Sequence, residues 1–245
     1  MSVRYAILSD IHANAPALRA VLADLATAGV DHLLCLGDLV GYGADPGWVV
    51  ETIAGRDAIV VAGNHDHAAA GLLDLDWFNP YARAAAEWTA GQLTADQTRR
   101  LAGLPLVTEH AGAMLVHASP LNPEEWPYLI SAADGARALA AYATPLGFVG
   151  HSHLPTVWAL REDGSVGFKR DPRRVTLIPG ERYLVNVGSV GQPRDGDPAA
   201  AYALWDPDGG FVEIRRVRYD TVEASRRIYA AGLPRVLGER LLHGR

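Results

Sequence analysis

The chain has 245 residues, of which 49% are hydrophobic and 20% are charged, and its formal net charge is −6. This composition excludes a disordered chain, and the length fits one large α/β domain. The negative charge disfavours duplex nucleic acid as a partner, because a phosphate backbone selects basic faces.

The only cysteine, Cys35, cannot form an internal disulfide, and its apolar neighbours predict a buried thiol. The N-terminal apolar run is too short for a signal segment. No stretch approaches the ~18 uninterrupted apolar residues of a membrane-spanning helix. We therefore expect a cytoplasmic protein that does not contact a membrane.

The first third of the chain alternates apolar runs with helical patterns. Runs at 4–8, 32–36 and 58–62 predict buried strands that end in polar residues. Helical spacing follows the first run, with Asn14 and Pro16 as start signals and Gly29 as the stop, and a second helix is predicted over 46–54. Such alternation is typical of a mainly parallel sheet covered by helices.

An Ala-rich helical segment is predicted over 68–104, with a capping box formed by Thr94 and Gln97. It carries Trp77, Phe78 and Trp88. These aromatic residues either belong to a lid that stacks a nucleobase above the site or pack in the core, which is the more common role of aromatic residues at helical spacing. If they are exposed, they would permit a homodimer.

The remainder of the chain is predominantly β. A hairpin is predicted from 106–110 and 113–117, followed by a helix at 131–142 and a strand at 147–149. Further strands are predicted at 156–160, 166–170, 175–178, 183–187, 200–205 and 211–218, before a helical tail that breaks at Pro234. No linker or internal repeat divides the chain. We therefore predict one domain over 1–245, a four-layer α-β-β-α sandwich of two mixed sheets with 68–104 as a helical insertion.

Acidic, His and Asn residues directly follow five of the predicted strands. They are Asp10 and His12, Asp38, Asn64 and His65, His117, and His151 and His153. In open α/β sheets the carboxyl ends of strands meet at one crevice. Each residue alone could be a helix cap, a turn residue or a core histidine. Their presence at five separate strand ends instead indicates a shared metal site.

These residues resemble the motif series of the calcineurin-like metallophosphoesterases. The motifs are D-x-H at 10–12, G-D at 37–38, G-N-H-D at 63–66, a strand-end histidine at 117 and G-H-x-H at 150–153. Ser152 stands where the family commonly has Thr, which leaves both histidine ligands in place. Asn186-Val187-Gly188-Ser189 also resembles the family's N-P-G-S turn, with Val in place of Pro.

The resemblance implies a site for two divalent cations. One cation would be held by Asp10, His12, Asp38 and His153, and the other by Asp38, Asn64, His117 and His151, with Asp38 bridging. Imidazole and carboxylate ligands suit Mn, Fe, Zn, Co or Ni, and the family favours Mn or Fe. The cations would generate a bridging hydroxide that attacks the phosphate in line. The absence of Cys ligands disfavours a structural zinc site.

The resemblance also implies catalytic roles for His65 and Asp66. His65 would protonate or clamp the leaving group, and Asp66 would fix the tautomer of that imidazole by a hydrogen bond; the alternative for His65 is a supporting role. Two residues are candidates for substrate binding. Arg194 either clamps a phosphate or pairs with a neighbouring aspartate, and Tyr42 either lines the pocket or packs in a tight turn.

The sequence resembles the small bacterial and archaeal branch of the family. We therefore expect a metal-dependent phosphodiesterase or phosphatase that acts on small, nucleotide-like phosphate esters. The alternative enzyme is an asymmetric dinucleoside polyphosphate hydrolase. Alternatives from other classes are a catalytically silent, metal-dependent nucleotide sensor and a structural zinc protein.

Overall fold

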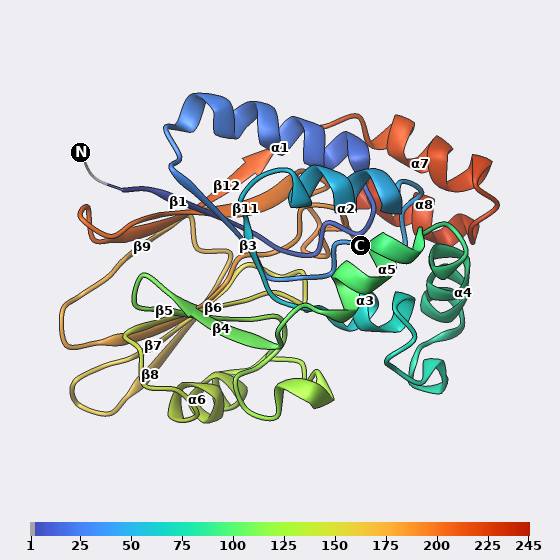
Figure 1. The fold of residues 1–245 in the computed structure, drawn as a ribbon. Coiled ribbons are helices and arrows are strands. Elements are labelled where there is room, and N and C mark those ends of the chain that lie inside the picture. Colours follow the sequence, from blue (N-terminus) through green and yellow to red (C-terminus); the bar gives the residue numbers. More distant parts are fainter. Residues whose placement is uncertain (1–2) are drawn as a thin grey trace.

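The computed structural model describes residues 3–245 and contains two six-stranded mixed sheets (Figure 1). The first sheet has the order β3-β2-β1-β11-β12-β9 and the second β4-β5-β6-β10-β7-β8. The first sheet comprises β1 (Tyr5–Leu8), β2 (His32–Cys35), β3 (Ile59–Val60), β9 (Arg174–Thr176), β11 (Ala200–Asp206) and β12 (Phe211–Val217). The second comprises β4 (Val107–His110), β5 (Ala113–Val116), β6 (Leu146–Val149), β7 (Thr156–Leu160), β8 (Val166–Arg170) and β10 (Arg182–Asn186).

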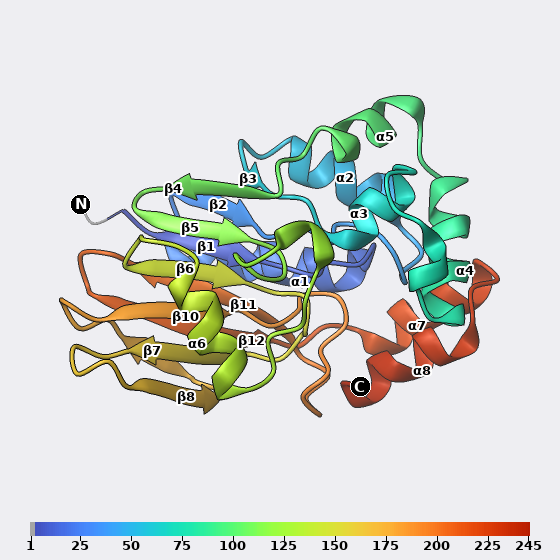
Figure 2. The same cartoon turned by 90° about the horizontal axis from the view of Figure 1, so that it is seen from below.

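Helices cover the outer faces of both sheets. The first sheet carries α1 (Ala15–Ala28) and α2 (Pro46–Ala54), and the second carries α6 (Ala132–Ala140). Figure 2 shows the remaining helices gathered at one end of the sheets: α3 (Asn64–Ala69), α4 (Pro80–Ala90), α5 (Ala95–Ala102), α7 (Thr221–Ala230) and α8 (Arg235–His243). The short 3-10 helices η1 (Leu75–Trp77) and η2 (Pro123–Glu125) lie in the connections. The predicted α-β-β-α sandwich with two mixed sheets is confirmed.

The alternation of side chains along the strands builds the layers. In β1, Tyr5 and Ile7 face the core between the sheets, whereas Ala6 and Leu8 face the helical layer on the first sheet. Phe148 of the second sheet meets Trp205 of the first at 5.7 Å between ring centroids. Burying side chains of this size on both faces of the sheets is the main source of stability.

Local signals place the elements close to their predicted positions. Asn14 caps α1 by accepting from Ala17 N, and Gly29 ends that helix with φ 65°. The third strand is shorter than predicted, because Ala62 N donates to Pro105 O instead of continuing the pairing with β2. The strands β1, β2 and β3 are parallel to one another, so their carboxyl ends share one edge.

The helical segment 68–104 packs against the C-terminal helices. Ala82 and Ala85 of α4 share a buried cluster with Ile228 and Leu237, and Trp88 packs against the same cluster. Trp88 is therefore a packing residue rather than part of a lid. Within residues 3–245, no helix is long and apolar enough to span a membrane.

Candidate metal centre

The polar residues predicted at the strand ends come together between the two sheets. The first sheet supplies Asp10, His12 and Asp38 from the loops after β1 and β2, and Asn64 from the start of α3, which follows β3. The second sheet supplies His117, His151 and His153 from the loops after β5 and β6. Five of the seven have a left-handed backbone, with φ between 50° and 63°: Asp10, His12, Asp38, His151 and His153. Such conformations are unfavourable for residues other than glycine and concentrate at functional sites.

Three of the histidines are held in one tautomer by backbone carbonyl groups. The Nδ1 contacts are His12 to Val40 O at 3.0 Å, His117 to Leu36 O at 2.7 Å and His153 to Gln192 O at 2.5 Å. A carbonyl oxygen only accepts, so each Nδ1 carries the hydrogen, and each ring presents an Nε2 lone pair whenever it is neutral. This arrangement is typical of metal-binding histidines.

The free ring nitrogens face carboxylate oxygens instead of hydrogen-bond donors. Asp10 Oδ1 lies 3.1 Å from His153 Nε2 and 3.7 Å from His12 Nε2. Asp38 Oδ2 lies 3.6 Å from His12 Nε2 and 3.3 Å from His117 Nε2, so one carboxylate oxygen lies between two histidines. The lone pairs of neutral His12 and His153 face the Asp10 carboxylate, which is unfavourable without a positive charge between them. The donor set therefore fits divalent cations.

The ligand atoms form three overlapping groups among the described residues, and two of them match the predicted division, whereas the third joins His12 and Asp38 with His65. Asp10, His12 and His153 offer atoms within 4.8 Å of one another, as do Asp38, His117 and His151. Asn64 Oδ1 and His151 Nε2 are buried and have no hydrogen-bond partner within residues 3–245. Unpartnered buried acceptors of this kind are ready to coordinate a cation.

The electrostatics of the site reflect its burial and its paired charges. Burial lowers the pKa of His117, but the carboxylates of Asp38 and Asp10 outweigh it and raise this pKa to about 9. Burial would raise the pKa of Asp38, but the neighbouring imidazoles hold it well below its usual range. Burial lowers the pKa of His65 to about 4 and that of His151 to about 3. Asp38 is thus charged at neutral pH, as metal binding requires, whereas a cation that binds His117 would displace the proton from its Nε2.

Asp66 does not hold the His65 imidazole as expected. Its Oδ1 accepts from Leu39 N at 2.9 Å and Val40 N at 3.3 Å, and its Oδ2 accepts from Gly63 N at 3.0 Å. His65 Nδ1 has no partner within the part of the chain that the structure describes. Asp66 lies in the first turn of α3, so its carboxylate caps the N-terminus of this helix and also binds the loop after β2. The predicted Asp66–His65 hydrogen bond is therefore wrong.

Close backbone packing also positions the ligands. A Cβ at Gly63 would lie 2.0 Å from Asp38 Oδ1, and a Cβ at Gly150 would lie 2.4 Å from Asp10 Oδ2. Only glycine permits these approaches. The two glycines of the G-N-H-D and G-H-x-H motifs therefore let the loops of neighbouring strands pack against the acidic ligands.

A layer of hydrogen bonds behind the ligands joins the two sheets. Asn186 Nδ2 donates to Gly150 O and Ser152 Oγ, and Ser189 Oγ donates to Asp10 O. The Ser152 hydroxyl thus accepts a hydrogen bond from the Asn186 side chain. Through these bonds, the Asn-Val-Gly-Ser turn holds the loops after β1 and β6 in position.

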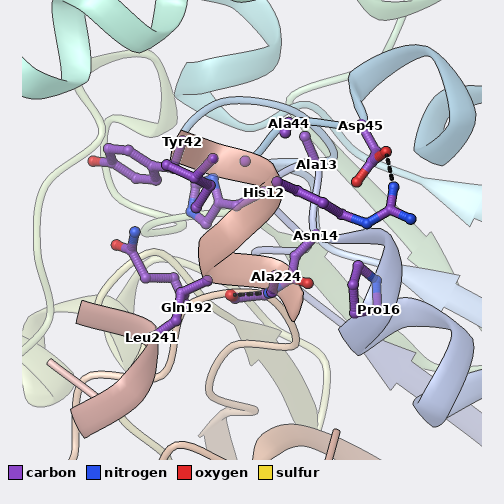
Figure 3. A pocket seen from close by; sticks show the side chains of 14 residues that line it. His12, Ala13, Asn14, Pro16, Tyr42, Ala44, Asp45, Gln192, Ala224 and Leu241 are labelled. Carbon is purple, nitrogen blue, oxygen red and sulfur yellow. Dashed lines mark hydrogen bonds and ion pairs between the residues drawn. The ribbon is translucent and has the colours of Figure 1, made fainter. Parts of the chain in front are cut away.

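Figure 3 shows the other side of the loop after β1, where a small pocket borders His12, Tyr42 and the C-terminal helices. Asn14 Nδ2 donates to Gly191 O, and Arg227 of α7 pairs with Asp45 at 2.8 Å. The Arg227–Asp45 pair ties α7 to the segment after β2, whereas the Asn14–Gly191 bond joins the loop after β1 to the segment after β10.

Four of the candidate ligands, Asp38, Asn64, His151 and His153, line a cavity of about 800 Å³ that Arg194 and Tyr42 also line. Arg194 donates to Gln192 Oε1 and lies over the Tyr42 ring at 5.7 Å. Asp195 pairs with Arg216 instead, so the expected alternative of a neighbouring aspartate as the partner of Arg194 is not found within residues 3–245. Tyr42 is 7% exposed and therefore both packs and lines the cavity.

Two aromatic residues of the loop before α6 were not predicted at the site. The Tyr128 ring stacks on His151 at 4.1 Å, and Trp126 meets His117 edge-on at 5.9 Å. This loop has no periodicity, and the only hint in the sequence was the aromatic pair around Pro127. Across the cavity, Phe78 meets His65 edge-on at 5.0 Å and Trp77 is 90% exposed.

The family model of the calcineurin-like phosphoesterase superfamily domain matches residues 3–210. The chain belongs to this superfamily. The phosphoesterase is 41% identical over 244 residues to Uncharacterized protein MJ0912 of Methanocaldococcus jannaschii, and the match covers 98% of each chain. It is also similar to a metallophosphoesterase from Sphaerobacter thermophilus, with a TM-score of 0.87, 41% identity and 100% of each chain covered. Hypothetical protein PH1004 from Pyrococcus horikoshii OT3 shares the fold, with a TM-score of 0.81, 24% identity and 99% of each chain covered.

Proposed function

We propose that this phosphoesterase binds two divalent cations and hydrolyses small, nucleotide-like phosphate esters, as a phosphodiesterase or phosphatase. The observation that carries the proposal is the placement of Asp38 Oδ2, which lies within 3.6 Å of His12 Nε2 and 3.3 Å of His117 Nε2 at the cavity. A carboxylate between two histidine-containing groups fits a bridging ligand. Mn or Fe is the expected metal, and Zn, Co or Ni would fit the same donors.

The protein residues would divide the ligands as the two groups suggest. Asp10, His12 and His153 would hold one cation, whereas Asn64, His117 and His151 would hold the other, and Asp38 would be shared. When bound, the two cations would lower the pKa of a water between them and neutralise phosphate oxygens. Asp10 and Asp38 contribute only two negative charges against four positive ones, so the occupied site would attract an anionic ester.

Two residues of the cavity wall would act on the ester itself. Arg194 is fixed by Gln192 and Tyr42 and presents a guanidinium that can bind a phosphate oxygen. The His65 ring is held between Tyr42 at 4.4 Å and Phe78 at 5.0 Å and lines the same cavity. We assign to His65 the donation of a hydrogen bond to the leaving oxygen. Asp66 supports the loop after β2 rather than this imidazole.

The test is metal-dependent hydrolysis by the full chain. The protein is stripped with a chelator, and Mn²⁺, Fe²⁺, Zn²⁺, Co²⁺ or Ni²⁺ is restored before assay with bis-p-nitrophenyl phosphate and p-nitrophenyl phosphate. We expect hydrolysis that returns with metal. Failure of every metal to restore hydrolysis of either ester would refute the proposed enzyme and favour a nucleotide sensor, whereas fewer than two ions per chain would contradict the two-cation site.

One variant distinguishes a role of His65 in turnover from a role in metal binding. His65→Ala should retain two ions per chain and lose about 10²–10⁴-fold in kcat, the usual contribution of a group that assists proton transfer. Metal content and kcat are measured on the same sample. Unchanged kcat would show that His65 has only a supporting role.

A further inference from the structure

The cavity beside the metal centre has an uneven distribution of charge. Among the described residues that line it, Arg194 is the only Lys or Arg, and it lies on the Tyr42 side. The outer wall carries three carboxylates, those of Asp74, Glu124 and Glu125. A phosphate at the metal centre would thus have one guanidinium nearby, whereas any group further out would meet acidic side chains.

These carboxylates differ in how firmly they are held. Asp74 Oδ1 accepts from Asp76 N and caps η1, and Glu125 accepts from Asn122 Nδ2 at 3.1 Å. Glu124 makes no hydrogen bond with the residues that the structure describes, and both glutamates are exposed. Their charges therefore face the cavity mouth and solvent without a cationic partner among residues 3–245.

The same outer wall is aromatic. Trp126 and Tyr128 lie on one side, in contact with the metal-binding histidines His117 and His151. Trp77 lies in the segment that forms another part of the wall, and its 90% exposure leaves the ring free to cover a ligand. Flat aromatic surfaces suit a nucleobase, which stacks with about 1–3 kcal/mol per base.

We propose that Glu124 and Glu125, together with the aromatic wall of Trp77, Trp126 and Tyr128, select nucleoside esters that carry a single phosphate and reject polyphosphates. This inference rests on the proposed function and specifies its substrate class. The base lies against the aromatic wall while Arg194 and the metal centre take the one phosphate. A chain of further phosphates would extend toward the two glutamates and be repelled by them. The chain accordingly disfavours the hydrolysis of dinucleoside polyphosphates.

The test compares two substrates of the metal-loaded full chain. One is the p-nitrophenyl ester of adenosine 5′-monophosphate, with a single phosphate, and the other is diadenosine tetraphosphate. We expect a higher kcat/KM for the single-phosphate ester. E124Q/E125Q should raise kcat/KM for the tetraphosphate about tenfold, as expected for removal of a few repulsive charge pairs in water, and leave the single-phosphate ester within about twofold. The gain should shrink at high salt.

A matched variant controls for net charge. E109Q/E239Q removes two exposed carboxylates outside the cavity and changes the net charge equally. It should leave both kcat/KM values unchanged. A gain in this control equal to that in E124Q/E125Q would show that global charge, not the cavity wall, sets the preference, and would overturn the inference.

A separate variant tests whether the aromatic wall binds the base. Trp77→Ala removes an exposed ring and should raise KM for the adenylate ester about fivefold to tenfold, at the low end of the range for a lost stacking contact, with kcat retained. Methyl p-nitrophenyl phosphate, which lacks a base, should be unaffected.

The outcomes separate this inference from the proposed function. Equal or better hydrolysis of the tetraphosphate by the wild-type protein, with no change in E124Q/E125Q, would overturn the inference and leave the phosphoesterase intact. An unchanged KM in Trp77→Ala would remove the stacking half of the proposal. Absence of hydrolysis of every ester with every metal would refute the proposed function, and the inference with it.

Discussion

Asp66→Asn tests whether this buried carboxylate supports the metal-binding loops. Its oxygens accept three backbone N–H groups, from Leu39, Val40 and Gly63. An asparagine oxygen can still accept from Leu39 and Val40, but the amide NH₂ then faces Gly63 N–H, donor against donor. One buried donor left without an acceptor costs about 1–3 kcal/mol, which corresponds to a fall in Tm of about 2–10 °C for a domain of this size.

The same substitution should weaken cation binding. Val40 donates its N–H to Asp66 and offers its carbonyl oxygen to His12 Nδ1, so a shift of this residue moves a metal ligand. We expect about a tenfold to hundredfold loss of Mn²⁺ affinity, the usual effect of losing an outer partner of a metal ligand. Thermal unfolding of the chelated protein gives the first quantity, and calorimetric titration with Mn²⁺ gives the second.

Asp134→Asn is the matched control, because Asp134 also accepts backbone N–H groups at a helix start, from Ile130 and Ser131, but lies away from the site. It should lower stability by at most about 1–2 kcal/mol and leave Mn²⁺ affinity unchanged. If Asp66→Asn kept wild-type stability and Mn²⁺ affinity but lost turnover, Asp66 would act on His65 after all, and the reasoning from its hydrogen bonds would be refuted.

Three further predictions concern the bridging ligand, cation binding and the helical segment 68–104. Asp38→Ala should reduce the metal content below one ion per chain, measured by elemental analysis, because both groups lose a shared ligand; retention of two ions would exclude bridging by Asp38. Addition of Mn²⁺ at about 100 times its dissociation constant should stabilise the chelated protein by about 2.7 kcal/mol in chemical unfolding, and an unchanged midpoint would count against a site in the folded state. Trp88→Ala should lower the free energy of unfolding by about 3 kcal/mol without changing KM, since Trp88 packs against the C-terminal helices; a raised KM with normal stability would place this ring in the lid instead.

The layers and the position of the candidate metal ligands could be predicted because each depends on short-range patterns. Alternating residues such as Ala6 and Ile7 face opposite sides of β1, and a parallel strand delivers its next polar residue to the carboxyl edge. His117 and Asp38 are 79 positions apart in sequence, yet each directly follows an apolar strand. The rule for strand ends places each residue at the carboxyl edge of its own sheet, and the packing of the two sheets then brings these edges together.

The role of Asp66 could not be predicted, because it depends on where a side chain points rather than on where its backbone lies. Adjacent residues of a helical turn diverge by about 100° in direction, so His65 and Asp66 cannot both face the cavity. The aromatic wall was missed for a related reason. Trp126 and Tyr128 lie in a loop without a periodic pattern, and their contacts with His117 and His151 arise only from tertiary packing.

The candidate metal centre also connects the two sheets. His117 of the second sheet donates from Nδ1 to Leu36 O of the first, and His151 N donates to Asp10 Oδ2 at 3.0 Å. The ligands from both sheets thus hold one another in place, whereas the neutral rings of His12 and His153 turn their lone pairs toward the Asp10 carboxylate, which opposes close approach. A bound cation would remove that opposition, since it is attractive to both sides. Binding of metal and closure of the sheets at this end should therefore be coupled, and hydrogen exchange of the amides at His151 and Gly150 should slow when Mn²⁺ is added.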